Sequence, residues 1–306
     1  MLELFKKHNA LFFILLFIIV YKFTWYLCNR YIIIYTNPMK IIDYKRYDRI
    51  NTKPVAISTY ITIPIFIINL RSRKDRKEYM IKLMKELNFK NYMFIEPVSL
   101  EKTLDFATRI GINTAIIKED LKLLKPLSLV ATNINILENF KAKFPNNNKF
   151  IIMEDDIKVY SKENINNILL NSEKVMYDQF YLEFCNGHCS KFKKIYDNVF
   201  KLNGKVHCTA AIIYDVKIID KIVQFFYSSK NITSMNDCFY MHRWWWPCGL
   251  HHWDWLLDNF YDNFNYNRYG YPYFRQKEDL GSDLDWGNPR ENDVFLTDLC
   301  RENMLT

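Results

Sequence analysis

Residues 63–76 read IPIFIINLRSRKDR and lead from an apolar run into a basic turn. The run Ile63–Leu70 is rich in β-branched residues, which is typical of a central strand covered on both faces. The next stretch, Asp75–Leu87, carries apolar residues at helical spacing, and Tyr92–Val98 is again strand-like. Strand, helix and strand in this order predict a βαβ unit.

The rest of the body continues this alternation of helices and strands. We expect further helices at residues 130–144 and Val216–Phe226, and further strands at Phe150–Met153, Tyr181–Cys185 and Cys208–Tyr214. The sequence shows no internal repeat and no strong second domain boundary. It therefore predicts an α/β fold with a mixed, mostly parallel sheet flanked by helices.

The N-terminal region differs from the body. Ala10–Cys28 is an apolar run interrupted by one charge, Lys22, and it is long enough to span a bilayer as a helix. A signal peptide is the alternative, but no small-residue cleavage site follows the run. We predict a membrane anchor at 1–35, a stem linker at 36–60 and a folded domain at 61–306. The expected topology is single-pass, type II, with a luminal catalytic domain, although the flanking charges do not decide the orientation.

Composition and charge exclude several classes of protein. The chain has 7 glycines in 306 residues and no GxG or GxxxxGK arrangement, which argues against P-loop hydrolases, Rossmann dinucleotide enzymes and protein kinases. The formal net charge is +8, but nine basic and three acidic residues place +6 of it in residues 1–60. The body is therefore nearly neutral, and we expect no nucleic-acid partner.

The cysteines leave two interpretations open. Six of the seven lie in the body, an even number that permits three disulfides. A zinc site is the less favoured alternative, because its candidate ligands do not have the usual CxxC spacing. These candidates are Cys185, His188, Cys189, His207 and Cys208. Asn231 opens an Asn-Ile-Thr glycosylation sequon, which suits a luminal glycoprotein.

An acidic cluster gives the clearest chemical signal. Glu154, Asp155 and Asp156 directly follow the expected strand Phe150–Met153, and no basic residue intervenes before Lys158. Crowded carboxylates raise each other's pKa unless a cation compensates, and oxygen ligands favour Mn²⁺ or Mg²⁺ over zinc. The cluster therefore predicts a metal site formed by these three acids, and a solvated acidic turn is the alternative.

The basic turn after the first strand is the second signal. Arg71, Arg73, Lys74 and Arg76 gather where the sheet ends and a helix begins, and Asp75 can cap that helix or orient the arginines. Arginines beside a helix N-terminus can hold a diphosphate. A solvated basic turn remains the alternative for each single residue.

Several stretches in this order resemble glycosyltransferase family 25, the lipooligosaccharide and collagen galactosyltransferases. The opening strand and turn match the family's NLxxRxDR pattern through Asn69, Leu70, Arg73, Asp75 and Arg76. Further similar stretches are MEDD (153–156), HCTAAIIYDVKIIDKI (207–222), WDWLLDNF (253–260) and YPYFRQKEDLGSDLD (271–285), the last through Pro272, Gln276 and Ser282. The chain departs from the family where a Ser-His pair is replaced within Ser128, Leu129, Thr132 and Asn133.

The resemblance implies a GT-A fold, a UDP-hexose donor, a divalent metal and transfer with inversion. It places the donor near Asn69, Arg73, Asp75, Arg76 and Gln276. The expected activity is transfer of galactose or glucose from a UDP-sugar to a hydroxyl of a glycan or protein.

An inverting transfer needs a base, and Asp254 is our candidate, with a helix cap as the alternative role. The tryptophans at 244–246, 253 and 255 form either an acceptor platform or ordinary core. The rival hypothesis for the whole chain is an inactive, membrane-anchored carbohydrate-binding relative.

Overall fold

The structure is a computed structural model that describes Lys22 and residues 63–118, 121–187, 192–203, 206–207, 209–228, 231–237, 252–264 and 266–276. The expected anchor (1–35) and stem (36–60) therefore lie outside the described residues, apart from Lys22. Within the described ranges, no helix combines the length and the hydropathy that crossing a membrane requires. The cysteine and histidine side chains of the expected disulfides and of the zinc alternative also lie outside the part of the chain that the structure describes.

The described body is built on an eight-stranded sheet with the order β2-β1-β3-β10-β5-β11-β8-β7. Its strands are β1 (Ile65–Ile68), β2 (Tyr92–Ile95), β3 (Lys149–Glu154), β5 (Gln179–Tyr181), β7 (Phe192–Tyr196), β8 (Val199–Leu202), β10 (Ala211–Asp215) and β11 (Arg268–Gly270). The pairings make β10 and β8 run against the other six strands. The expected mixed, largely parallel sheet with flanking helices is confirmed.

Two small antiparallel sheets accompany the large one. β4 (Ile157–Val159) pairs with β12 (Phe274–Gln276), and β6 (Cys185–Gly187) pairs with β9 (Val206–His207). The expected strand Tyr181–Cys185 is therefore wrong as one element. Its residues divide between β5 in the large sheet and β6 in a small one, and the link between them carries Glu183.

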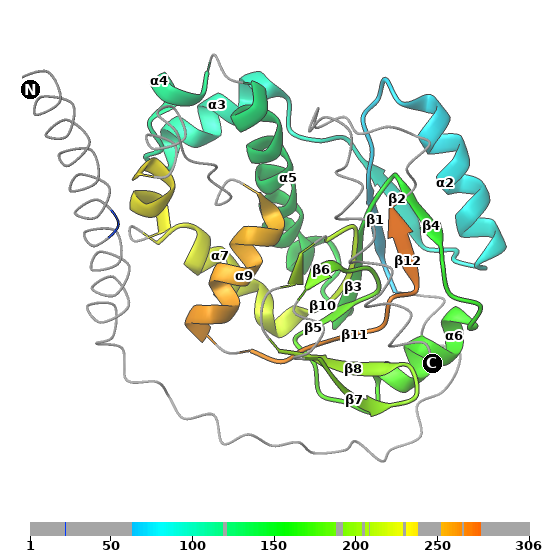
Figure 1. The fold of residues 1–306 in the computed structure, drawn as a ribbon. Coiled ribbons are helices and arrows are strands. Elements are labelled where there is room, and N and C mark those ends of the chain that lie inside the picture. Colours follow the sequence, from blue (N-terminus) through cyan, green and yellow to red (C-terminus); the bar gives the residue numbers. More distant parts are fainter. Residues whose placement is uncertain are drawn as a thin grey trace, which may run out of the picture. The chain divides into compact units, whose positions relative to one another are not determined.

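Helices flank the sheet as Figure 1 shows. They are α2 (Lys74–Glu86), α3 (Leu100–Arg109), α4 (Thr114–Ile117), α5 (Leu121–Lys143), α6 (Ile165–Ser172), the 3₁₀ turn η3 (Val216–Ile218), α7 (Ile219–Phe226) and α9 (Trp253–Phe264). α2 lies to one side of β1 and β2, whereas α3, α5, α7 and α9 gather on the other side (Figure 1). The βαβ unit β1–α2–β2 is present, with β1 and β2 parallel.

Aromatic packing fastens α5 to the sheet. Phe140 of α5 stacks on Phe150 of β3 at a centroid distance of 4.1 Å and meets Phe66 of β1 edge-on at 5.9 Å. Phe150 in turn stacks on Tyr214 of β10 at 5.3 Å. These rings are buried, so α5 shares one hydrophobic core with β1, β3 and β10. The packing fixes the positions of these three strands.

Candidate active site

The candidate site lies at the edge where β1 and β3 end. The two strands are parallel neighbours and their register pairs Ile68 with Glu154. Asn69 follows β1, and Asp155 and Asp156 form the turn after β3. Because parallel strands end at the same edge of a sheet, residues that are far apart in the sequence converge here.

Asp155 is held on both of its carboxylate oxygens. Asn69 donates from Nδ2 to Oδ2 at 2.6 Å, and Arg76 donates from Nη1 to Oδ1 at 2.7 Å. Arg76 lies in the first turn of α2 and is 3% exposed, so its charge faces the acids rather than solvent. Asn69 also donates to the carbonyl oxygen of Arg73 at 3.2 Å, which links the basic turn to the acidic one.

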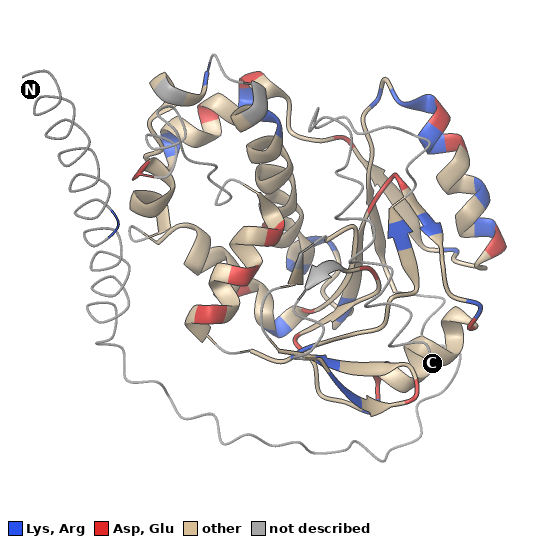
Figure 2. Cartoon of the chain, in the orientation of Figure 1, with Lys and Arg blue, Asp and Glu red and all other residues tan. Residues whose placement is uncertain are grey.

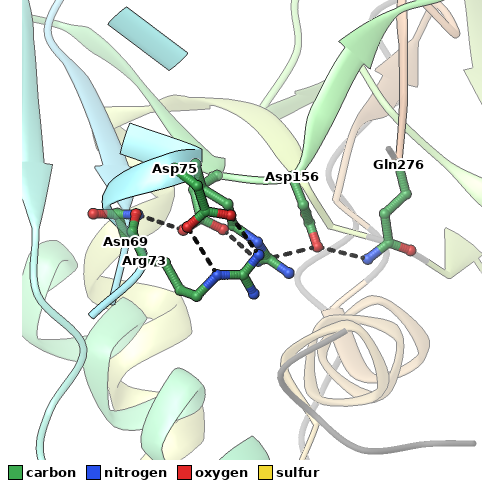
Figure 3. A network of polar contacts seen from close by, with 7 residues as sticks. Asn69, Arg73, Asp75, Asp156 and Gln276 are labelled. Carbon is green, nitrogen blue, oxygen red and sulfur yellow. Dashed lines mark hydrogen bonds and ion pairs between the residues drawn. The ribbon is translucent and has the colours of Figure 1, made fainter. Parts of the chain in front are cut away.

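Asp156 is oriented by two side chains. Arg76 Nη1 lies 3.5 Å from Oδ2, and Gln276 donates from Nε2 to the same oxygen at 3.2 Å, as Figure 3 shows for the labelled Gln276 and Asp156. Gln276 reaches the site because β12 pairs with β4 and places Gln276 opposite Ile157. The other oxygen, Oδ1, is buried and has no hydrogen-bond partner among the described residues. Burial raises the pKa of Asp156, although Arg76 and Gln276 partly oppose this.

Glu154 stands beside further carboxylates. Desolvation, followed by the charges of Asp156, Glu183, Asp155 and Asp254, raises its pKa well above the usual range. The structure thus brings the candidate base Asp254, in the first turn of α9, into the electrostatic field of the acidic cluster. A half-buried carboxylate crowded by other acids, as Glu154 is, is costly to ionise unless positive charge is supplied nearby.

Glu183 is a site residue that sequence reasoning missed. It follows β5 and is 1% exposed, and its backbone N–H donates to the carbonyl oxygen of Ala211 at 3.3 Å. On the other side of β10, the N–H of Glu154 donates to the carbonyl oxygen of Ala210 at 2.8 Å. The two glutamates therefore flank the small residues Ala210 and Ala211. The available signal was a lone acid within the apolar sequence YLEFC.

The basic turn places Arg73 and Asp75 near the surface and Arg76 in the interior. Arg73 donates to both oxygens of Asp75, from Nε at 3.1 Å and from Nη2 at 2.9 Å (Figure 3). This pairing with Arg73 lowers the pKa of Asp75 to about 2. Arg71 is exposed, while Arg76 is turned inward. Of the two arginines in the predicted donor site, only Arg73 thus presents its guanidinium near the surface.

Asp254 lies in the first turn of α9, one residue after the helix begins. Its Oδ1 accepts the backbone N–H of Trp255 at 2.8 Å. Asp258 and Asp262 follow it at intervals of four along α9, which carries no Lys or Arg (Figure 2). An N-cap side chain accepts the second or third N–H of its helix, so this bond to the next residue does not make Asp254 the cap of α9.

The positions that depart from family 25 have structural roles. Ser128 donates from Oγ to the carbonyl oxygen of Val98 at 2.5 Å, and Thr132 Oγ1 accepts the N–H of Val98 at 2.9 Å. Both hydroxyls sit on α5 and hold the segment that follows β2. These residues therefore anchor α5 to the chain after the second strand.

The acidic side chains of the described residues do not by themselves form a complete set of metal ligands. Among the residues that the structure describes, no three His, Cys, Asp or Glu side chains are arranged as joint metal ligands. Mg²⁺ and Mn²⁺ commonly use one or two carboxylates and take their remaining ligands from water and substrate phosphate. The buried, unpartnered Oδ1 of Asp156 and the neighbouring Glu154 fit such a site.

Comparisons with known proteins find only weak structural similarity. No protein-family model matches it, and no curated protein matches it. One similar solved structure is a glycosyltransferase involved in the glycosylation of the major capsid of PBCV-1, at 11% identity and a TM-score of 0.29, covering 56% of this chain and 68% of that one. Another is mouse xyloside xylosyltransferase 1, at 8% identity and a TM-score of 0.37, covering 67% and 82%. Likenesses this weak decide neither family nor activity, and the family 25 resemblance stays a prediction.

Proposed function

We propose that the chain is a metal-dependent glycosyltransferase that moves a hexose, galactose or glucose, from a UDP-sugar to a hydroxyl of a glycan or protein, with inversion. The observation that carries the proposal is Asp156, a buried carboxylate whose Oδ1 lacks a partner among the described residues, inside a group of acids at the carboxyl edge of the sheet. Ligands of open α/β sheets bind at this edge.

Asp156 and Glu154 would hold Mn²⁺ or Mg²⁺. When bound, the ion supplies positive charge that offsets the diphosphate of the donor and the charge that develops as it departs. The third predicted ligand, Asp155, already uses both oxygens in hydrogen bonds to Asn69 and Arg76. We therefore assign Asp155 to the support of Asp156, with Arg76 as the charge that holds the two aspartates together.

The remaining residues bind and orient. Arg73 would contact the donor diphosphate, exchanging part of its pairing with Asp75 for phosphate, since guanidinium binds either group bidentately. Asn69 fixes the position of the Arg73 backbone, and Gln276 holds Oδ2 of Asp156. These contacts leave Oδ1 of Asp156 to face a ligand.

Asp254 is the proposed base. The acceptor hydroxyl oxygen attacks the anomeric carbon, the bond from that carbon to the diphosphate oxygen breaks, and the hydroxyl proton passes to the Asp254 carboxylate. The charge of Asp254 acts on Glu154 and raises its pKa, which supports this role.

The apolar run Ala10–Cys28 supports a further proposal, that residues 1–35 anchor the domain to a membrane as a single-pass type II protein.

The test is release of UDP from UDP-galactose and UDP-glucose by the full chain in detergent with MnCl₂. Asp156→Asn should lower turnover by about 10²–10³-fold, because it removes a charged ligand at unchanged volume. Asp197→Asn is the matched control, since Asp197 is 92% exposed and pairs only at the surface with Lys194. Full activity in Asp156→Asn would refute the metal assignment. No UDP release by a folded wild type would refute transfer from these donors and favour the inactive carbohydrate-binding alternative.

A further inference from the structure

The two carboxylate oxygens of Asp156 have different surroundings. Oδ2 accepts a hydrogen bond from Gln276 Nε2 at 3.2 Å and lies 3.5 Å from Arg76 Nη1. Oδ1 is buried and has no hydrogen-bond partner among the described residues. A buried acceptor without a partner costs free energy, so Oδ1 is the oxygen that gains most from contact with a bound cation.

Gln276 belongs to a strap, residues 271–276, whose backbone is fixed on both sides. The N–H of Tyr273 donates to the carbonyl oxygen of Leu182 at 2.9 Å, and the carbonyl oxygen of Tyr273 accepts the N–H of Tyr160 at 2.9 Å. β12, the last part of the strap, also pairs with β4 directly after the acidic turn. The backbone of Gln276 is therefore held in one position relative to that turn.

The Gln276 side chain is exposed, so it approaches the buried Asp156 carboxylate from the solvent side (Figure 3). The amide is neutral and donates one N–H to Oδ2. Gln276 therefore leaves the charge of Asp156 intact and occupies one of its two oxygens. Because the side chain is exposed, its replacement removes this hydrogen bond without disturbing the core.

Occupation of Oδ2 limits how Asp156 can bind a cation. Ca²⁺ accepts about six to eight oxygens in a flexible geometry and often takes both oxygens of one carboxylate. Mg²⁺ and Mn²⁺ suit octahedral oxygen sites, and Mg²⁺ keeps several waters and uses few carboxylates. An aspartate with only Oδ1 available supplies one ligand, which disfavours Ca²⁺ more than the smaller ions.

We infer that Gln276 is a residue that determines ion selectivity: it holds Oδ2 of Asp156 so that only Oδ1 binds the ion, and the site thereby takes Mn²⁺ or Mg²⁺ and discriminates against Ca²⁺. The inference rests on the proposed function and names what selects its ion. Gln276 acts through Asp156, so it is a positioning residue rather than a catalytic one. Its loss should change the relative affinity for different ions and leave the fold intact.

The chain offers a matched control for Gln276. Gln224 is an exposed glutamine of α7, and no hydrogen bond in the described part of the chain joins its side chain to the acids. Methionine has nearly the length of glutamine and lacks the amide donor. Gln276→Met and Gln224→Met therefore make the same chemical change at the site and away from it.

The experiment is Mn²⁺ binding to the full chain in detergent, followed by electron paramagnetic resonance with Ca²⁺ as the competitor. Wild type and Gln224→Met should bind Mn²⁺ and need a large excess of Ca²⁺ to release it. Gln276→Met should lower the ratio of the Ca²⁺ Kd to the Mn²⁺ Kd by about tenfold, because Oδ2 becomes available as a second ligand. Thermal melts give a second readout, in which Ca²⁺ should stabilise Gln276→Met more than wild type.

An unchanged Kd ratio in Gln276→Met would overturn the inference, because a merely structural role weakens the binding of both ions equally. A folded wild type that binds Ca²⁺ as tightly as Mn²⁺ would also overturn it. Absence of Mn²⁺ binding by a folded wild type would overturn both the inference and the metal-dependent reaction. Selectivity that depends on Gln276, without UDP release from either UDP-sugar, would support the inference and count against the proposed transfer.

Discussion

Two buried arginine–aspartate networks lie in the same domain, and they differ in charge balance. Arg268 of β11 is 1% exposed and donates from Nη1 to Asp258 Oδ1 at 2.7 Å, the distance that also joins Arg76 to Asp155. Asp258 additionally accepts the N–H of Val206 at 2.9 Å, and the Arg268 guanidinium lies 3.7 Å from the centre of the Tyr261 ring. In this network one cation meets one carboxylate.

The network at Arg76 is not balanced. Arg76 forms ion pairs with both Asp155 and Asp156, so one cation faces two carboxylates, and Glu154 adds a further carboxylate beside them. Glu183 and Asp254 act on Glu154 as well. A balanced buried pair fastens α9 to the strands beside it, whereas an excess of buried negative charge is a cost to the fold that a bound cation can relieve.

Removal of each arginine is the sharpest way to test this contrast and should have the largest effect on stability. Arg268→Met and Arg76→Met should each lower the free energy of unfolding by about 3–5 kcal/mol, because each leaves a buried carboxylate without its cation. Thermal melts of the full chain with and without MnCl₂ then separate the two networks. Mn²⁺ should recover part of the loss in Arg76→Met and none in Arg268→Met.

The conservative variants Arg76→Lys and Arg268→Lys serve as controls, since they keep the charge and lose the second donor. Equal responses of the two methionine variants to MnCl₂ would show that charge imbalance does not distinguish the networks.

Neutralising Glu154 should have a smaller effect of the opposite sign. Glu154→Gln should raise the free energy of unfolding at neutral pH by about 1–2 kcal/mol, because a half-buried carboxyl group crowded by other acids is replaced by a neutral amide, while UDP release falls. The folded pKa of Glu154 is raised, so the stability that its protonated form contributes is present at low pH and is lost as pH rises through that pKa. The advantage of the variant should therefore grow with rising pH.

Chemical denaturation across a pH series measures this difference, and Glu173→Gln is a control because Glu173 pairs with Lys149 outside the site. A Glu154→Gln variant that is less stable than wild type at neutral pH would contradict the charge argument.

Local pattern was enough to predict much of the site. Three elements of the site are visible in the sequence: the apolar run before Asn69, the helix that carries Arg76 and the strand that ends at Glu154. Each end of these elements differs from the structure by one or two residues. Parallel pairing of β1 and β3 then brings Asn69 to Asp155. The inward orientation of Arg76 was not predictable, because sequence spacing does not say which basic side chain of a turn is buried.

Long-range topology accounts for most of the rest. Glu183 reaches the site only because β10 lies between β3 and β5, an order that no local signal contains. Gln276 was identified through the family resemblance, and its position depends on the pairing of β12 with β4, more than a hundred residues apart. α5 begins at Leu121 and includes Pro126, which a sequence reading treats as a helix breaker, so its first turns were missed.

The most direct test of the central claim is Mn²⁺ binding to the full chain, measured by electron paramagnetic resonance as the loss of the free-ion signal, with and without UDP. The excess of carboxylates around Asp156 predicts one bound Mn²⁺ per chain, tighter with UDP, and at least about tenfold weaker binding in Asp156→Asn than in Asp197→Asn. Equal Mn²⁺ affinity in these two variants would contradict the account.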